Sequence, residues 1–205
     1  MLTKFEIMLQ LQDDMNSKVH SDWRDQGFPW FRAIWIESAE MLDHYGWKWW
    51  KKQEPDIEQV ILELIDIWHF GLSVLLLENK NPQSLMNEAL SEWDGAENLQ
   101  VFPDELESFV ASILKTKGFE LVGFVRLMKS IGLDFETLYT RYVGKNVLNF
   151  FRQDNGYKDG TYRKLWAGRE DNEHLVELAL SLDTAVPAFK DNLYAALEKR
   201  YQESA

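Results

Sequence analysis

The sequence predicts an all-α protein, a multi-helix bundle of roughly six to eight helices, and three features support this fold class. Apolar residues recur at helical spacing along nearly the whole chain. No stretch shows a convincing alternation of apolar and polar residues, and the Asn155-Gly156 pair follows a helical segment instead of joining two strands. Residues that favour helix N-caps stand directly before several helical stretches. The 205 residues suit one domain, or one domain with an added lobe.

Three helices are expected in the first 78 residues of the chain. Residues 2–19 form the first helix, residues 20–30 a loop, and residues 31–45 a second helix that ends near Gly46. The cluster Trp47-Lys48-Trp49-Trp50-Lys51-Lys52 and the following Pro55 form a linker. Asp56 is expected to cap a third helix that runs to about Glu78. Because this helix is apolar almost all round, we place it at the centre of the bundle.

The second part of the chain is predicted to be helical with two irregular segments. Residues 79–103 contain the breakers Pro82, Gly95 and Pro103 and are expected to be less regular. Residues 154–169 are rich in Gly, Lys and Arg and show little helical pattern. The helices expected around these segments are 104–117, 119–131, 135–153 capped by Asp134, one capped by Asp171 or Asn172 that ends at Leu182, and one from Pro187 to Tyr201.

The composition is that of a globular protein with a large acidic excess. Hydrophobic residues make up 45% and charged residues 27%, and 22 Lys+Arg against 34 Asp+Glu give a net charge of −12. Such acidity argues against nonspecific binding to nucleic acid, and the absence of Cys excludes disulfides, thiolate zinc sites and thiol nucleophiles. The N-terminus does not resemble a secretory signal. The longest uncharged apolar run, residues 67–77, has 11 residues, too few to span a bilayer, so we expect a cytoplasmic protein without a membrane partner.

Four carboxylates on the second and third predicted helices form the first candidate site. Glu37 and Glu40 are three residues apart, as are Glu63 and Asp66, so each pair shares one helix face. Both pairs have bulky apolar neighbours, and a desolvated carboxylate needs a partner. If the two helices are antiparallel neighbours, the carboxylates converge, and a hard divalent cation such as Mg²⁺ relieves their repulsion. The alternative is that both pairs lie on solvated faces of amphipathic helices.

A cationic segment forms the second candidate site. On the helix predicted over residues 135–153, Lys145, Asn149 and Arg152 share one polar stripe. Residues 141–169 hold seven Lys/Arg and two Asp, so their net charge is +5 and that of the remaining chain is −12 − 5 = −17. Such a segment suits a loop that closes over phosphates. The alternative is a solubilising loop paired with acidic neighbours.

The two candidate sites together suggest a reaction. Acidic residues that hold Mg²⁺ and basic residues that hold a polyphosphate are the components of metal-assisted phosphoryl chemistry. A carboxylate that the metal does not saturate can accept the proton of the attacking water. The residues alone therefore lead to the hypothesis of a nucleoside-polyphosphate hydrolase.

Three motifs in these regions resemble those of the all-α dimeric dUTPases, relatives of the MazG-like NTP pyrophosphohydrolases. The first is Glu37-x-x-Glu40 followed, after 22 intervening residues, by Glu63-x-x-Asp66. The second, near the N-terminus, is Leu11-Gln12-x-x-Met15-Asn16. The third is the long and most specific one, Gly144-Lys145-Asn146-Val147-Leu148-Asn149-x-x-Arg152-Gln153-x-x-Gly156-Tyr157-Lys158-x-Gly160-x-Tyr162-x-Lys164-x-Trp166-x-Gly168-x-Glu170-Asp171-Asn172.

The resemblance implies a role for each matched residue. It implies that Glu37, Glu40, Glu63 and Asp66 bind two or more Mg²⁺ ions, for which Mn²⁺ can substitute, and that Glu40, with Glu37, is catalytic and activates water. The implied substrate-binding residues are Gln12 and Asn16 at the uracil edge, Trp47 and His69 in the nucleoside pocket, Asn149 at the deoxyribose or base, and Lys145, Arg152, Tyr157, Lys158 and Lys164 at the phosphates.

The resemblance also implies a reaction and an assembly. The reaction is hydrolysis of dUTP, and also of dUDP, with dUTP giving dUMP and pyrophosphate, and the assembly is a homodimer. The chain is expected to be one domain over 1–205, with metal-binding helices in 31–78, a smaller mobile helical lobe in 79–133, and a phosphate-binding helix and loop in 134–172. Residues 79–133 carry little recognisable motif, so the extent of this lobe stays open.

Two other functions fit parts of the sequence. A related pyrophosphohydrolase for dCTP or several dNTPs would have the same metal site and different base-reading residues, and side-chain amides can suit uracil or cytosine. A noncatalytic helical interaction protein would show a broken acidic quartet or a lost basic stripe, and both are intact in this sequence.

Overall fold

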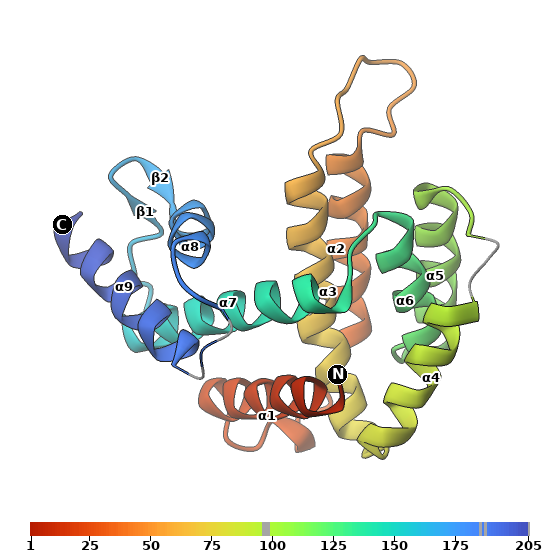
Figure 1. Ribbon diagram of the computed structural model, residues 1–205, viewed down its shortest axis with the longest axis horizontal. Coiled ribbons are helices and arrows are strands. Elements are labelled where there is room, and N and C mark those ends of the chain that lie inside the picture. The colour runs from red at the N-terminus through yellow and green to blue at the C-terminus, as the bar shows by residue number, and fades with distance from the viewer. Residues whose placement is uncertain (96–98, 185, 187, 205) are drawn as a thin grey trace.

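A computed structural model describes residues 1–95, 99–184, 186 and 188–204 of the chain. These residues form nine α-helices, one short 3-10 helix and a two-stranded antiparallel sheet, which confirms the all-α fold class (Figure 1). The elements are α1 (Leu2–Val19), η1 (Trp23–Asp25), α2 (Trp30–Tyr45), α3 (Ile57–Glu78), α4 (Pro82–Gly95), α5 (Phe102–Thr116), α6 (Leu121–Ser130), α7 (Phe135–Asp154), β1 (Leu165–Trp166), β2 (Arg169–Glu170), α8 (Asp171–Leu180) and α9 (Phe189–Glu203).

Helices α2 and α3 lie side by side as an antiparallel hairpin at the centre of the molecule (Figure 1). Helix α2 ends at Gly46, whose φ of 84° places it in the left-handed region that suits a helix C-cap. Helix α3 begins after Asp56, whose side chain accepts a hydrogen bond from the backbone N–H of Gln59 at 3.2 Å. These two ends match the sequence prediction and set the register of the acidic residues on the two helices.

Helix α3 is the main core helix of the fold. Its length and mean hydropathy of 2.0 meet the requirements for a membrane span, and 67% of that stretch is buried inside the protein. Its apolar surface is thus covered mostly by neighbouring helices, as the expected central position requires. Close packing extends to Gly71, where an added Cβ would lie 2.5 Å from the ring of Phe119.

Helices α4, α5 and α6 form a lobe on one side of the α2–α3 hairpin (Figure 1). The expectation of an irregular segment over 79–103 was wrong for most of its length, because α4 fills residues 82–95 and α5 begins at Phe102. Pro82 and Pro103 stand in the first turns of these helices, where a missing N–H costs no helical hydrogen bond. Arg126 ties the lobe together through Glu105 at 2.6 Å and Glu92 at 3.1 Å.

Helix α7 runs from the centre of the molecule to the opposite end, where α8 and α9 pack on it (Figure 1). Asp134 caps α7 as predicted and accepts from the backbone N–H of Thr137 at 2.7 Å. The predicted cap of α8 was wrong, because Glu170 is the N-cap and forms a capping box with Glu173. Asp171 instead turns its side chain inward and is buried. Pro187, the predicted start of the last helix, lies outside the described residues, and α9 begins at Phe189.

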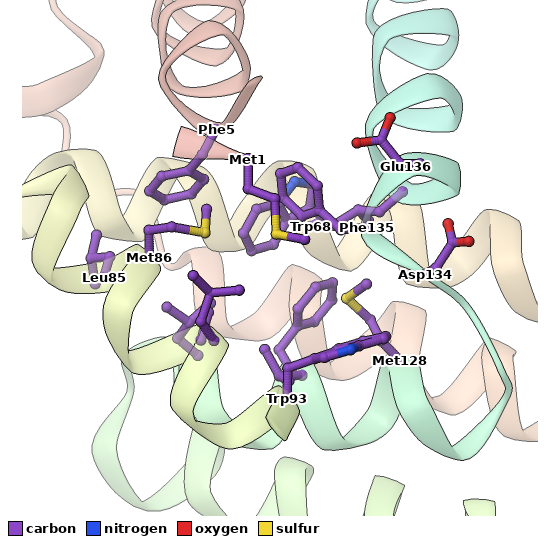
Figure 2. A pocket seen from close by; sticks show the side chains of 16 residues that line it. Met1, Phe5, Trp68, Leu85, Met86, Trp93, Met128, Asp134, Phe135 and Glu136 are labelled. Atoms are coloured by element: carbon purple, nitrogen blue, oxygen red, sulfur yellow. The ribbon is translucent and has the colours of Figure 1, made fainter. Parts of the chain in front are cut away.

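An apolar cavity of about 190 Å³ lies where α1, α3, α4, α6 and α7 meet (Figure 2). Figure 2 shows Phe5, Trp68 and Met128 around it, with the carboxylates of Asp134 and Glu136 at one edge. Its lining offers no group of converging polar side chains for a phosphate or a base. This cavity is therefore separate from the acidic and basic residues that the sequence singled out.

Candidate functional site

Three of the four predicted metal-binding carboxylates come together between α2 and α3. One carboxylate oxygen each of Glu37, Glu63 and Asp66 lies within 4.8 Å of the other two. The three-residue spacing puts Glu63 and Asp66 on one face of α3, and Glu37 approaches from the paired helix. Glu40 is exposed and, among the described residues, does not belong to this group of three. The geometry thus forms a three-carboxylate cluster with Glu40 one turn further along α2.

Mutual repulsion and burial change the protonation of this cluster. Burial raises the pKa of Glu37 to about 8, with further contributions from the negative charge of Asp66 and the hydrogen bond and charge of Glu63. Burial also raises the pKa of the Glu63 carboxyl. A proton on one of these groups reduces the repulsion among them, and a divalent cation can replace that proton. Carboxylate oxygens at this spacing are the donor set that hard cations such as Mg²⁺ prefer.

Lys145 of α7 reaches the acidic cluster from the third side. Its Nζ lies 3.0 Å from Oδ2 of Asp66 and 3.5 Å from Oδ1 of Asn172, and only 6% of the residue is exposed. This contact joins the cationic stripe of α7 to the carboxylates of α3. The two candidate sites that the sequence suggested separately are therefore parts of one site.

The rest of the α7 stripe is held by a buried ion pair. Nη1 of Arg152 donates to Oδ1 of Asn149 at 3.2 Å, while its Nε and Nη2 donate to the two carboxylate oxygens of Asp171 at 2.8 Å each. The hydroxyl of Tyr162 also donates to Asp171, at 2.9 Å. Burial raises the pKa of the Asp171 carboxyl, but the hydrogen bonds and charge of Arg152 outweigh it and hold the pKa below its usual value.

A cavity of about 250 Å³ adjoins the acidic cluster and shares Asp66 with it. Asn149 of α7 reaches this cavity from the stripe. Besides Asp66 and Asn149, the side chains that line it are Gln12, Met15, Asn16, Val19, His20, Trp23, Phe28, Trp30, His69 and Phe70. A pocket with aromatic walls and a few converging amides is suited to a planar polar ring such as a nucleobase.

A buried hydrogen-bond chain fixes the amides in this cavity. Nε2 of Gln12 donates to Oδ1 of Asn16 at 2.9 Å, and Nδ2 of Asn16 donates to Oγ of Ser73 at 2.9 Å. Oε1 of Gln12 accepts from the Tyr142 hydroxyl at 3.2 Å and lies 2.8 Å from Nδ1 of His69. Because a carbonyl oxygen can only accept, Nδ1 of His69 is the donor in this contact.

His69 therefore has a second ring nitrogen, Nε2, that is not engaged by Gln12. Burial lowers the pKa of His69 to about 4, so the ring is neutral. Its Nε2 is then an acceptor, and in the part of the chain that the structure describes it has no hydrogen-bond partner. The buried Nε1–H of Trp30, also in the cavity wall, likewise lacks a partner among the described residues. Two residues of the cavity wall thus each hold a buried polar atom without a protein partner within the described ranges, one an acceptor and one a donor.

Four predicted substrate-binding residues lie outside the cluster, the cavity and the α7 stripe. Trp47 is 45% exposed in the α2–α3 loop, its ring centroid is 5.2 Å from that of Trp50, and it is not among the described residues that line this cavity. Tyr157 is 49% exposed, with its ring centroid 5.8 Å from the Arg152 guanidinium. The other two are exposed lysines: Lys158 donates to the carbonyl of Val19 at 3.3 Å and Lys164 lies 3.6 Å from Glu170.

Several residues of the site were not identified from the sequence. Phe28, Trp30 and Phe70 form cavity walls, and only Trp30 and Phe28, next to Pro29 in a predicted loop, carried a signal as bulky apolar residues outside a helical pattern. Ser73 and Tyr142 support side chains of the site through hydrogen bonds. So do Tyr162, Asp171 and Asn172, which stand in the third motif but received no role from the sequence. Such tertiary contacts leave no periodic pattern in one sequence.

Comparison with known proteins assigns the family. A family model described as dUTPase matches residues 4–157, which includes α1 to α7 and most of the site. The acidic cluster, the cavity and the α7 stripe all lie within the matched residues, while Tyr162, Asp171 and Asn172 lie beyond them. Comparison with curated proteins gives no match.

Proposed function

The chain belongs to the all-α dUTPase family and is thus a dUTP diphosphatase, and from this premise we propose how its residues perform the reaction. The proposal is Mg²⁺-dependent hydrolysis of dUTP to dUMP and pyrophosphate, with dUDP as a second substrate. One observation carries it: Asp66 belongs both to the acidic cluster and to the wall of the adjoining cavity. A nucleoside in that cavity directs its phosphates toward the carboxylates and the α7 stripe.

The neutral His69 and its partners supply the basis for selecting uracil. Uracil presents an N–H donor between two carbonyl acceptors, whereas cytosine presents an unprotonated ring nitrogen beside an amino group. Nε2 of His69 can accept from the uracil N–H but repels the cytosine nitrogen, and Nε1–H of Trp30 can donate to a carbonyl. Gln12 and Asn16 complete the base-reading edge with their amide N–H groups. This set favours dUTP over dCTP.

Glu37, Glu63 and Asp66, joined by Glu40, are the residues that would hold Mg²⁺. The ion supplies charge neutralisation on the phosphoryl oxygens and lowers the pKa of a bound water when it is present. Two or more ions fit a site of four carboxylates, because one ion leaves a net negative charge. Mn²⁺ has the same preference for oxygen ligands and is expected to substitute.

Glu40 is our proposed base for the attacking water. It lies outside the three-carboxylate cluster yet close enough that its negative charge raises the pKa of both Glu37 and Glu63. A carboxylate that is exposed and one turn from the cluster can accept a proton without giving up a cluster contact. Glu37 assists by ligating the ion on the same helix face.

The cations of α7 and the following loop bind the phosphates in this proposal. Lys145 neutralises charge next to Asp66, and Arg152 offers the N–H groups that Asp171 and Asn149 leave available. Tyr157, Lys158 and Lys164 are exposed, so they reach the phosphates only when the loop after α7 moves toward the cavity. We propose that Trp47 also reaches the substrate only when its loop moves, because Trp47 is exposed in that loop.

We also propose that the protein works as a homodimer in the cytoplasm. Family membership implies an oligomer, and α2 exposes Trp35 and Ile36 at 44% and 46% of their surfaces. Large exposed apolar side chains on a regular helix suit an interface with a second copy. No nucleic acid or membrane partner is required for the activity.

The test is pyrophosphate release from dUTP, dCTP, dTTP and UTP, and phosphate release from dUDP, each with Mg²⁺, Mn²⁺ or EDTA. We expect dUTP to be preferred by at least about tenfold, which corresponds to one discriminating hydrogen bond of about 1.4 kcal/mol. Comparable rates with dCTP would contradict the assignment of uracil as the preferred base. Undiminished activity in EDTA would contradict the requirement for a metal ion. Glu40→Gln is expected to abolish turnover, with Glu54→Gln, an exposed loop acid, as its matched control.

A further inference from the structure

A buried, bidentate ion pair near the site lies partly outside the residues that match the family. Arg152 is on α7, within the match, whereas Asp171 is the first residue of α8, 14 positions beyond its end at residue 157. Asp171 is 0% exposed, and its two oxygens take parallel hydrogen bonds of 2.8 Å from Nε and Nη2 of Arg152. A bidentate pair of this kind fixes the plane of the guanidinium as well as its position.

We propose that Asp171, supported by Tyr162, is a positioning residue that aims Arg152 at the phosphates of the nucleotide. This inference rests on the proposed function, since it takes the substrate contact of Arg152 from it. Asp171 has no exposed surface, so it cannot touch the nucleotide and acts through Arg152 alone. The C-terminal segment from the loop after α7 to α8 thereby becomes part of the catalytic apparatus.

The hydrogen bonds of Arg152 show which of its donors remain for the substrate. A guanidinium has five N–H groups. Two point to Asp171 and a third, on Nη1, points to Asn149 at 3.2 Å. The remaining two, one on each terminal nitrogen, have no hydrogen-bond partner in the described part of the chain, so they are the donors left for a phosphate. Because Asp171 and Asn149 hold the other three N–H groups, the plane of the guanidinium is fixed and the two remaining N–H groups keep one orientation.

Tyr162 holds Asp171 in turn. Its hydroxyl donates to Oδ2 of Asp171 at 2.9 Å, the same oxygen that accepts from Nε of Arg152. The Tyr162 ring stacks on Tyr201 of α9, with centroids 5.5 Å apart and an interplanar angle of 11°. The carboxylate is thus fixed from two helices and a loop. Glu170 and Glu173 complete the arrangement, because they satisfy the α8 N-terminus and leave Asp171 free to point inward.

The capping of α8 by Glu170 also distinguishes a positioning role of Asp171 from a role in stabilising the helix N-terminus. A carboxylate in the first helical turn would ordinarily interact with free backbone N–H groups. Here Glu170 caps the helix. Asp171 also interacts with the backbone N–H of Asn172, but both of its oxygens accept from side chains, Oδ1 from Arg152 and Oδ2 from Arg152 and Tyr162. If Arg152 is misdirected, the loss of turnover is expected to be much larger than the loss of stability, because a displacement of about 1 Å can reduce turnover ~100-fold.

The test is a double-mutant cycle on kcat/KM for dUTP with Asp171→Asn and Arg152→Ala. We expect Asp171→Asn to lower kcat/KM by ~10–100-fold. If Asp171 acts through Arg152, the double variant is no slower than Arg152→Ala alone. Losses that multiply would overturn the inference, and so would a rise in activity, which would mean that Asp171 withholds Arg152 from the phosphates. Wild-type activity of Arg152→Ala would instead refute the substrate contact of the proposed function.

Tyr162→Phe keeps the test informative if Asp171→Asn does not fold. This variant leaves the ion pair in place and removes one hydrogen bond to it, so we expect a ~2–10-fold loss of kcat/KM that vanishes in the Arg152→Ala background. Tyr194→Phe is the matched control, because its hydroxyl donates to another aspartate, Asp154, at 2.8 Å. It is expected to retain wild-type kcat/KM, and equal losses in both variants would overturn the role of Tyr162.

Discussion

The ammonium of Lys145 lies 3.0 Å from the carboxylate of Asp66, and both side chains are largely shielded from solvent. The pair joins α7 to α3 at the point where the acidic cluster borders the cavity. It gives one residue of the acidic cluster a protein cation as its neighbour. The charge at this point therefore depends on α7 as much as on the α2–α3 hairpin.

Replacing Lys145 with Met tests this relationship. Because the substitution removes a cation from beside the phosphates and leaves Asp66 unpaired, we expect kcat/KM for dUTP to fall by ~100-fold or more. Steady-state kinetics at saturating Mg²⁺ measures the effect. Lys199→Met removes an exposed ion pair with Glu203 and is the control that should behave as wild type. Near-normal kinetics of Lys145→Met would show that the Asp66 contact is structural only.

Mg²⁺ affinity is predicted to increase with pH. Without metal the pKa of Glu37 is about 8, so below that pH the ion must displace a proton. The affinity for Mg²⁺ therefore increases by up to about tenfold per pH unit between pH 6.5 and 8, and it levels off above pH 8. Calorimetric titration with Mg²⁺ at pH 6.5, 7.5 and 8.5 measures this slope. A pH-independent affinity of the wild-type protein, or an unchanged slope in Glu37→Gln, would contradict the prediction.

The buried His69 is predicted to make the fold less stable in mild acid. Its pKa falls from 6.5 to about 4 on burial, so the unfolded chain binds more protons between these values. The contribution of His69 to the free energy of unfolding therefore decreases as pH is lowered from 6.5 to 4, by up to about 1.4 kcal/mol per pH unit. Because the raised pKa of Glu37 acts in the opposite direction over this range, the contribution is the difference between the wild type and His69→Gln. Urea unfolding at pH 7, 6 and 5 measures it. His69→Gln should lose this component, whereas His20→Gln, in the exposed loop after α1, should keep it.

Gly71 is predicted to be required for the packing of α3 against the segment before α6. A Cβ at this position would lie 2.5 Å from the Phe119 ring, closer than side chains tolerate. We expect Gly71→Ala to reduce the free energy of unfolding by ~1–3 kcal/mol, the usual range for overpacking. Gly95→Ala, where an added Cβ meets nothing within 4 Å, is the control. Equal stability of the two variants would show that Phe119 moves aside at no cost.

The sequence predicted helices well where the ends carry their own signals. Asp56, Asp134 and Gly46 set helix ends through local hydrogen bonds or a left-handed φ, and the structure confirms all three. Pro82 was misread because a proline favours the first turn of a helix as much as it breaks an interior. Asp171 was misread for a different reason: its partner Arg152 is 19 residues away, and a cap and an ion pair need the same residue type.

The same distinction between local sequence signals and tertiary contacts applies to the candidate site. Glu37, Glu63 and Asp66 could be paired from three-residue spacing on two consecutive helices, and the structure brings them together. The cavity walls depend on how the loop after α1 folds against α3, which no periodicity encodes. Trp30, for example, belongs to α2 and lies against Phe70 of α3, with ring centroids 6.2 Å apart.

The hydrogen-bond chain from Ser73 through Asn16 to Gln12 has a consequence for how base preference can evolve. The Gln12 oxygen serves Tyr142 and His69 at once, and its amide nitrogen serves Asn16. Rotating that amide to suit another base would set its N–H against the N–H donor of His69 and its oxygen against the oxygen acceptor of Asn16, in a buried space. The amides that line the cavity are therefore held in one orientation by the protein itself. Under the proposed function, a change of base preference at Gln12 therefore requires substitutions at its buried partners as well.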